Sequence, residues 1–285
     1  MGPHCFFIWI LLICFTPSSA LAGHNDINTL FKLRDTVTEG KGFLRDWFDS
    51  EKGPCSWSGI TCVEHTVVEI DLSSVPIYAP FPSCVGLFQS LARLNFSGCG
   101  FSGELPDALG NLHNLEQLDL SHNQLTGALP VSLYGLKTLK EMVLDNNFFS
   151  GQLSPAIAQL KYLKKLSVSS NSISGAIPPE LGSLQNLEFL DLHMNALNGS
   201  IPAALGNLSQ LLHLDASQNN ICGSIFPGIT AMTNLVTVDL SSNALVGPLP
   251  REIGQLQNVQ LLILGHNGFK GSIPEEISKH PAGRA

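Results

Sequence analysis

Four side chains of types that commonly contact ligands lie close together in the sequence: Phe189, His193, Met194 and His213. Aromatic and Met side chains are enriched at protein interfaces. An unperturbed His titrates near pH ~6.5, so the two His residues would add a pH response. Phe189 and His213 are 24 residues apart, an interval that recurs through the chain. The group indicates a binding site, and ordinary scattered surface residues are the alternative interpretation.

The same interval defines a column of positions that contains Phe189 and His213. Lys165 and Glu141 continue it towards the amino terminus, and we include them among the candidate ligand-binding residues. Most of the column has the composition of a solvated sheet surface. Its members each lie six residues before the same point of the repeat: Glu69, Arg93, Gln117, Glu141, Lys165, Phe189, His213 and Thr237.

No arrangement of residues predicts catalysis, and we expect neither an enzyme nor a metal or cofactor site. The nine His residues are dispersed, without an H-E-x-x-H pairing, and no G-x-S-x-G motif occurs. Asp71, Asp119, Asp191 and Asp239 recur too regularly for a catalytic pair, so we interpret them as residues of a strand surface.

The elements that must position these side chains follow a repeat of the form L-x-x-L-x-L-x-x-N-x-L-x-G-x-[IL]-P. This pattern predicts an α/β fold of the leucine-rich-repeat type: a solenoid of 24-residue repeats with a parallel β-sheet on its concave face. Ser154 and Phe226 replace the proline in two repeats, where we expect local loop shifts. The recurring Asn occupies positions 123, 147, 171, 195, 219, 243 and 267.

Each repeated residue has a physical role. Leu118 and Leu120 alternate with polar residues, which is typical of a strand with one buried face. The Asn side chain has two donor hydrogens and an acceptor oxygen, so it can satisfy backbone groups that the following bend leaves unpaired. Cys99 takes the place of Asn in one repeat and should be buried. Val75 has no hydrogen-bonding side chain, so the first repeat should be irregular.

The amino-terminal part predicts secretion and a cap. The apolar run Cys5–Phe15 followed by Ala20–Ala22 indicates a signal peptide over residues 1–22, although it lacks Lys and Arg. Residues 23–64 would form the cap, with a helix over Asp26–Val37. In a secreted protein, Cys55 and Cys62 favour a disulfide over a metal site, because no second ligand pair has suitable spacing.

The repeats span residues 65–277, and residues 278–285 form an irregular tail without a closing cap, for which a truncated gene product is the simplest explanation. We expect Cys84, Cys99 and Cys222 to be unpaired, and Cys84 to be exposed.

Composition limits the partners. The 285 residues are 44% apolar and carry 15 basic against 23 acidic residues, a net charge of −8. We expect no nucleic-acid binding, because no basic patch is present. No membrane span is expected, because no later run reaches ~18 apolar residues. The sequons at Asn95, Asn198 and Asn207 are candidate glycosylation sites.

The cap sequence "PCSWSGITC", followed by repeats that end in "LxGxIP", resembles the ectodomain of plant leucine-rich-repeat receptor-like kinases over Asp26–Ile277. This resemblance implies an extracellular module that recognises a secreted peptide or small protein, together with a co-receptor ectodomain in some complexes. The kinase and membrane span of that family have no counterpart in the sequence. Two alternatives are a secreted inhibitor of a pathogen cell-wall hydrolase and the product of a non-functional gene fragment.

Overall fold

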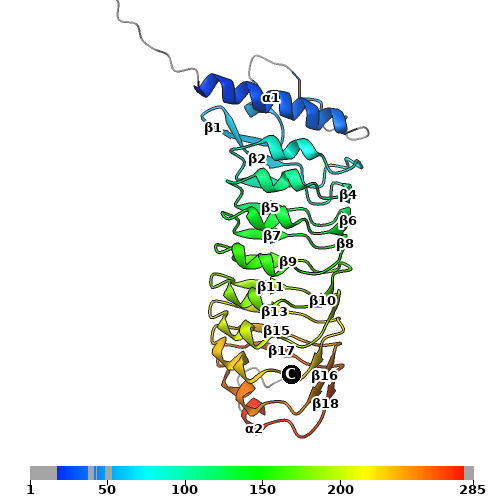
Figure 1. Ribbon diagram of the computed structural model, residues 1–285, viewed down its shortest axis with the longest axis vertical. Helices are drawn as coiled ribbons and strands as arrows, with labels where there is room; N and C mark the ends of the chain where they lie inside the picture. Colours follow the sequence, from blue (N-terminus) through cyan, green and yellow to red (C-terminus); the bar gives the residue numbers. More distant parts are fainter. Residues whose placement is uncertain (1–17, 38–41, 43, 49–52, 279–285) are drawn as a thin grey trace, which may run out of the picture.

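The computed structural model describes residues 18–37, 42, 44–48 and 53–278. These residues form an elongated stack of similar coils (Figure 1). Helix α1 (Ser18–Thr36) crosses one end of the stack, and the short helix α2 (Glu275–Ser278) lies at the other end.

One sheet of ten strands runs along the stack. Strand β1 pairs with β2 in the antiparallel direction, and every later pair in this sheet is parallel. Parallel neighbours are offset by 24 residues, as the sequence predicts; Phe189 lies opposite His213, for example. In spatial order the strands are β1 (Ile60–Val63), β2 (Thr66–Asp71), β3 (Arg93–Asn95), β5 (Gln117–Asp119), β7 (Glu141–Val143), β9 (Lys165–Ser167), β11 (Phe189–Asp191), β13 (His213–Asp215), β15 (Thr237–Asp239) and β17 (Leu261–Ile263).

Alternation along each strand separates the core from the outer surface of this sheet. In β5, Leu118 is buried, while Gln117 and Asp119 are half-buried on the opposite side. Leu118 lies in register between Leu94 and Met142, so each repeat covers the apolar side chains of its neighbour. We call the outer surface of the ten-stranded sheet the sheet face. It corresponds to the predicted concave face and carries the candidate binding column.

The recurring Asn makes the hydrogen bonds that its chemistry predicts. The Asn147 Nδ2 donates to the carbonyl oxygens of Leu120 (2.9 Å), Leu144 (3.1 Å) and Asp145 (3.2 Å). Its Oδ1 accepts the backbone N–H of Leu125 at 3.0 Å. Because Leu120 and Leu125 belong to the preceding repeat, each Asn joins two repeats as well as closing its own bend. The other six Asn residues of the column make the equivalent bonds.

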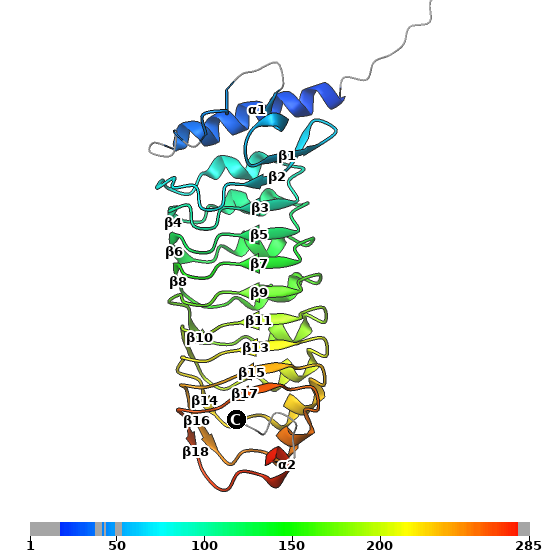
Figure 2. The same ribbon diagram turned by 180° about the vertical axis from the view of Figure 1, so that it is seen from behind.

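After the Asn, each coil returns through a short strand on one flank and a 3-10 helix on the back. Figure 2 shows the flank strands as a second row beside the ten-stranded sheet. These are β4 (Ser102–Glu104), β6 (Gln124–Ala128), β8 (Phe148–Ser150), β10 (Ser174–Ala176), β12 (Ala196–Asn198), β14 (Cys222–Gly223), β16 (Ala244–Gly247) and β18 (Gly268–Phe269). The 3-10 helices of the back are η3 (Ser83–Leu87), η4 (Asp107–Asn111), η5 (Val131–Gly135), η6 (Pro155–Gln159), η7 (Pro179–Ser183), η8 (Ala203–Asn207), η9 (Pro227–Ala231) and η10 (Arg251–Gln255).

Glycine is required at two kinds of position in this path. Gly127 has a φ of 77°, a conformation that side chains other than that of Gly disfavour. At Gly182 in η7, a Cβ atom would lie 2.1 Å from the carbonyl oxygen of Ala204 in η8. The absence of a side chain there allows successive 3-10 helices to stack closely.

The cap covers the apolar end of the stack with aromatic side chains. Trp47 and Trp57 are buried and stack with ring centroids 5.7 Å apart, and Phe31 of α1 lies 5.4 Å from the Trp57 ring. The cap includes a 3-10 turn, η2 (Pro54–Ser56), and Cys55 and Cys62 form the predicted disulfide. The apolar surface of the first repeat is thereby removed from water.

Several expectations differ from the structure in detail. The apolar run of the predicted signal peptide lies outside the described residues, whereas α1 begins at Ser18, before the predicted cleavage site and earlier than the predicted helix. The expected loop shifts at Ser154 and Phe226 are wrong. Their φ and ψ angles (−74° and 140°; −74° and 137°) match those of Pro130 (−64° and 139°), because the extended backbone there does not require proline.

The three remaining cysteines of the described residues are unpaired, as expected. The expected exposure of Cys84 is wrong: it is half-buried, because α1 packs on η3, which carries it. Burial raises the pKa of the Cys84 thiol. Cys99 is fully buried in the Asn column, where its Sγ lies 2.9 Å from the carbonyl oxygen of Leu72, and burial raises its pKa to about 12. The first repeat is irregular after Val75, as expected: Tyr78 has a positive φ of 50°, which the equivalent residues of the later repeats do not share.

Candidate ligand-binding face

The candidate column lies on the sheet face in the register that the 24-residue interval predicts. Each of its members pairs in the sheet with the equivalent residue of the next strand. The side chains also interact along the column. Arg93 forms a salt bridge with Glu69 at 2.6 Å, and the Gln117 amide donates to Glu141 at 3.1 Å. The column is therefore a chain of side-chain pairs that crosses the strands.

Aromatic and cationic groups meet in the middle of this column. The Phe189 and His213 rings stack with centroids 4.3 Å apart and planes inclined by 12°. The Lys165 Nζ lies over the Phe189 ring, 5.2 Å from its centroid, in a cation–π arrangement. The His213 Nδ1 forms a hydrogen bond with the Thr237 hydroxyl. Lys165, Phe189 and His213 thus form one group, which we call the ring cluster.

Met194 and His193 lie apart from the ring cluster, beyond the end of β11. Met194 has a positive φ of 55° and is 51% exposed, and the Ser170 hydroxyl donates to its sulfur at 3.6 Å. The six candidate residues therefore do not form a single patch. Lys165, Phe189 and His213 are brought together, Glu141 precedes them in the column, and His193 and Met194 mark the exit of the strand.

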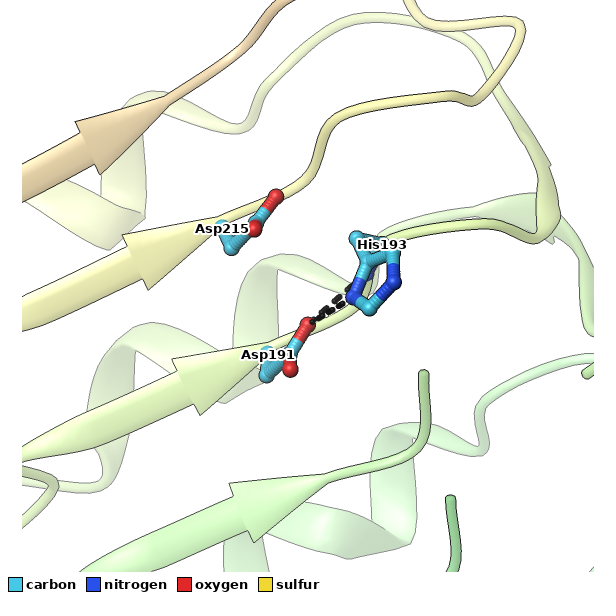
Figure 3. Close-up of side chains that lie close together, drawn as sticks. All are labelled: Asp191, His193 and Asp215. Atoms are coloured by element: carbon cyan, nitrogen blue, oxygen red, sulfur yellow. Dashed lines mark hydrogen bonds and ion pairs between the residues drawn. The ribbon is translucent and has the colours of Figure 1, made fainter. Parts of the chain in front are cut away.

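His193 is held by Asp191 (Figure 3). Both its backbone N–H and its Nδ1 lie 3.0 Å from the Asp191 Oδ1. Because a carboxylate only accepts hydrogen bonds, this contact places the ring proton on Nδ1 and leaves Nε2 facing outwards. In other repeats a Ser makes both bonds, as Ser217 does with Asp215. His193 is therefore a replacement for the serine that normally closes this turn.

Metal binding is an alternative role for Asp191, His193 and Asp215. Ligand atoms of Asp191, His193 and Asp215 lie within 4.8 Å of one another. However, Asp191 and Asp215 belong to the regularly repeated Asp column, and one oxygen of each already accepts two hydrogen bonds within its own turn. The arrangement is explained by turn formation alone.

A depression of about 190 Å³ opens on the sheet face beside the ring cluster, over strands β2 to β9. Glu141 and Lys165 were expected at the binding face. Arg93, Asp119 and Asp71 were assigned to the strand surface but were not among the candidate binding residues. The Arg93 guanidinium donates to Glu69 and lowers the pKa of that carboxyl group. The lining consists of Glu69, Asp71, Arg93, Leu94, Asn95, Gln117, Leu118, Asp119, Glu141, Val143 and Lys165.

The three sequons occupy different surfaces. Asn198 is exposed on flank strand β12, and Asn207 is exposed at the end of η8 on the back. Asn95 lies on the sheet face, where its Oδ1 accepts from the Ser97 N–H and hydroxyl and its Nδ2 donates to Asp71. Glycosylation of all three stays a prediction, and a glycan on Asn95 would cover part of the depression.

Family comparisons match most of the repeat region. The leucine rich repeat N-terminal domain matches residues 24–63, and leucine rich repeat models match residues 89–149, 156–221 and 234–256. A rice (Oryza sativa subsp. japonica) protein, leucine-rich repeat receptor protein kinase MSP1, is 70% identical over 105 residues. The match covers 37% of this chain but only 8% of the rice protein, so the chain represents a small part of that relative's length.

Solved ectodomains share the fold over a larger part of this chain. The ectodomain of the Arabidopsis thaliana receptor kinase GASSHO1/SCHENGEN3, in complex with CASPARIAN STRIP INTEGRITY FACTOR 2, superimposes with a TM-score of 0.85 at 31% identity. It covers 89% of this chain and 31% of that one. The Arabidopsis receptor kinase HAESA, in complex with the peptide hormone IDA and the co-receptor SERK1, gives 0.82 at 33% identity over 90% of this chain and 44% of that one. In the described part of the chain, no helix is long and apolar enough to cross a membrane.

Proposed function

This chain belongs to the leucine-rich-repeat family, and we propose that it is an extracellular recognition module of plant receptor-like type that binds a secreted peptide or small protein on its sheet face. A stack of repeats holds an extended surface in a fixed shape while individual surface residues vary. The peptide complexes of the similar ectodomains support this proposal, and we apply to this chain only the class of ligand.

The observation that carries the proposal is the ring cluster. Elsewhere in the column, neighbours pair by charge or hydrogen bonding, as Glu69 does with Arg93 and Gln117 with Glu141. At Phe189 and His213 the pair is two half-buried stacked rings. Large rings at the surface of a sheet retain apolar area that a partner can bury, and interface centres are enriched in such side chains.

The test compares secreted peptides captured by three forms of the full chain. The immobilised protein is incubated with fluid washed from plant extracellular space, and bound peptides and proteins are identified by mass spectrometry. We expect the wild type to retain a small secreted peptide or protein, and Phe189→Ala to lose it. An aromatic anchor removed from the centre of an interface costs ~2 kcal/mol or more, about a 30-fold loss of affinity.

Phe148→Ala is the matched control. Phe148 is likewise a Phe at the surface of a strand and is 60% exposed, but it belongs to flank strand β8. Its substitution should leave capture unchanged. Equal capture by Phe189→Ala and the wild type, with unchanged thermal melts, would refute the placement of the ligand. Capture of a cell-wall hydrolase in place of a peptide would support the inhibitor alternative.

A further inference from the structure

We infer that the ligand segment on the sheet face is an extended peptide that places a Lys or Arg side chain in the depression beside β5 and β7 and an apolar side chain on the ring cluster. This inference rests on the proposed function and adds the chemistry of the partner. Three properties of the depression support this inference. They are its excess of carboxylates, the engagement of its basic side chains with other partners, and its distance from Phe189.

The depression carries more acidic than basic groups, since four carboxylates and two cations line it. The Arg93 cation is already paired with Glu69 at 2.6 Å. Among the described residues, none of the three remaining carboxylates (Asp71, Asp119 and Glu141) forms a salt bridge. An incoming cation would therefore find acceptors that the protein itself leaves without a positive partner.

Lys165 does not neutralise these carboxylates. Its Nζ lies over the Phe189 ring, 5.2 Å from the ring centroid. Lys165 lies between Glu141 and Phe189 in the column, so its side chain approaches the neighbour that is not the carboxylate. The lysines of the adjoining edge are also occupied: Lys140 pairs with Glu116 at 2.7 Å, and Lys164 with Glu188 at 2.9 Å. The basic residues around the depression are thus engaged, while Asp119 and Glu141 keep an oxygen available.

The geometry of the sheet sets the spacing within the ligand. Glu141 and Phe189 are separated by two strand intervals, and Asp119 and Phe189 by three. At ~4.8 Å per interval, these separations are roughly 10 and 14 Å. An extended peptide advances ~3.3 Å per residue, so the basic and apolar side chains should be roughly three or four residues apart. A peptide that crosses the strands would contact both places at once.

Two substitutions remove the negative charge with little change in shape. Asp119→Asn has a natural precedent, because Asn95 occupies the equivalent position of an earlier repeat. The Asn95 Oδ1 accepts the Ser97 N–H, just as the Asp119 Oδ1 accepts the Ser121 N–H. Glu141→Gln keeps an oxygen that can accept from Gln117. The control, Glu104→Gln with Glu180→Gln, removes two exposed carboxylates from the flank and the back.

The experiment selects binders from a phage-displayed library of random linear peptides on the wild-type chain and measures the enriched peptides on each variant. We expect enriched peptides to carry Lys or Arg roughly three or four residues from an aromatic or large aliphatic residue. Their affinity should fall at least about tenfold on the Asp119→Asn/Glu141→Gln variant, remain unchanged on the control variant, and weaken at higher salt.

The outcomes separate this inference from the proposed function. Loss of binding on Phe189→Ala but not on Asp119→Asn/Glu141→Gln would overturn the basic-ligand inference and leave the binding face in place. No effect of either variant would refute both. Enrichment of peptides without a basic residue, or no enrichment above background, would also overturn the inference.

Discussion

Asn147→Ala should destabilise the repeat stack more than a typical surface substitution. Asn147 is 6% exposed, and its side chain contributes two donor hydrogens and one acceptor oxygen to backbone groups of two successive repeats. Alanine replaces none of these bonds. The N–H of Leu125 would be left without its side-chain partner inside the stack, and the Leu120 carbonyl would keep only the side-chain bond from Asn123.

The magnitude follows from the number of bonds. A hydrogen bond contributes a net ~1 kcal/mol, and a buried polar group left without a partner costs ~1–3 kcal/mol. Three hydrogen-bonding functions lost from a site this buried should therefore lower the free energy of unfolding by about 3–5 kcal/mol. Asn147→Cys should lose less, because Cys99 in the same column still contacts the carbonyl of Leu72.

The assay is urea unfolding, combined with hydrogen exchange at the Leu125 amide as a local reporter of the lost bond. The control is Asn186→Ala in the exposed turn between η7 and β11, where one bond to the Lys161 carbonyl is removed and the loss should stay below about 1 kcal/mol. Equal losses for Asn147→Ala and Asn186→Ala, with Leu125 still protected, would refute the reasoning, because water or a rearranged bend would then satisfy these groups.

Three further outcomes test the cap and the cysteines. Cys55→Ser should cost about 2–3 kcal/mol, because the disulfide with Cys62 closes a short loop; two free thiols in the non-reduced wild type would contradict this. At pH 8, iodoacetamide should modify Cys222, which is exposed, and spare Cys99, whose buried thiol has a pKa of about 12; equal labelling of folded protein would count against that burial. Burial raises the pKa of Asp26 in α1, so the folded state keeps a proton that the unfolded state releases. This residue should therefore lower the free energy of unfolding as the pH rises above the unfolded-state pKa of about 3.8. Asp26→Asn should flatten that slope in unfolding curves, and an unchanged slope would contradict it.

The fold was predictable because the repeat constrains it many times over. The Asn column, the alternating leucines and the interval of 24 residues predict the sheet register, in which Phe189 lies opposite His213. Each repeat contacts mainly its neighbours, so the same local solution serves throughout the stack. The cap disulfide followed from the separation of Cys55 and Cys62 and the expected secretion.

The directions of individual side chains were less predictable. Sequence spacing placed Lys165 between Glu141 and Phe189 but did not determine which of them its flexible side chain would approach. Met194 was grouped with Phe189 because they are close in the sequence, whereas it follows β11 in a turn with positive φ. The repeat pattern did not predict the burial of Cys84, because the helix that covers it, α1, lies outside the repeats.

Two columns of the sheet face differ in how freely they can vary, and this difference indicates where specificity resides. The Asp residues of one column close their turns by accepting hydrogen bonds from the residue two positions later, which is a Ser (Ser121 and Ser217) or a His (His193). Where Val143 and Ser167 interrupt it, Asp145 takes over and accepts from the Ser167 hydroxyl (2.6 Å) and the Ser169 N–H (2.8 Å). Substitution in that column therefore requires a compensating residue nearby.

The column of Glu141, Lys165, Phe189 and His213 has no comparable structural duty. Its contacts run between side chains, while the backbone bonds of the same strands are made regardless of residue type. Charges, amides and rings can therefore replace one another there without disturbing the turn. A surface that recognises one partner needs positions of this kind on a scaffold that does not move when they change. For this reason the substitutions proposed at Glu141 and Phe189 should alter ligand affinity while leaving the unfolding midpoint almost unchanged, in contrast to Asn147→Ala, which should do the reverse.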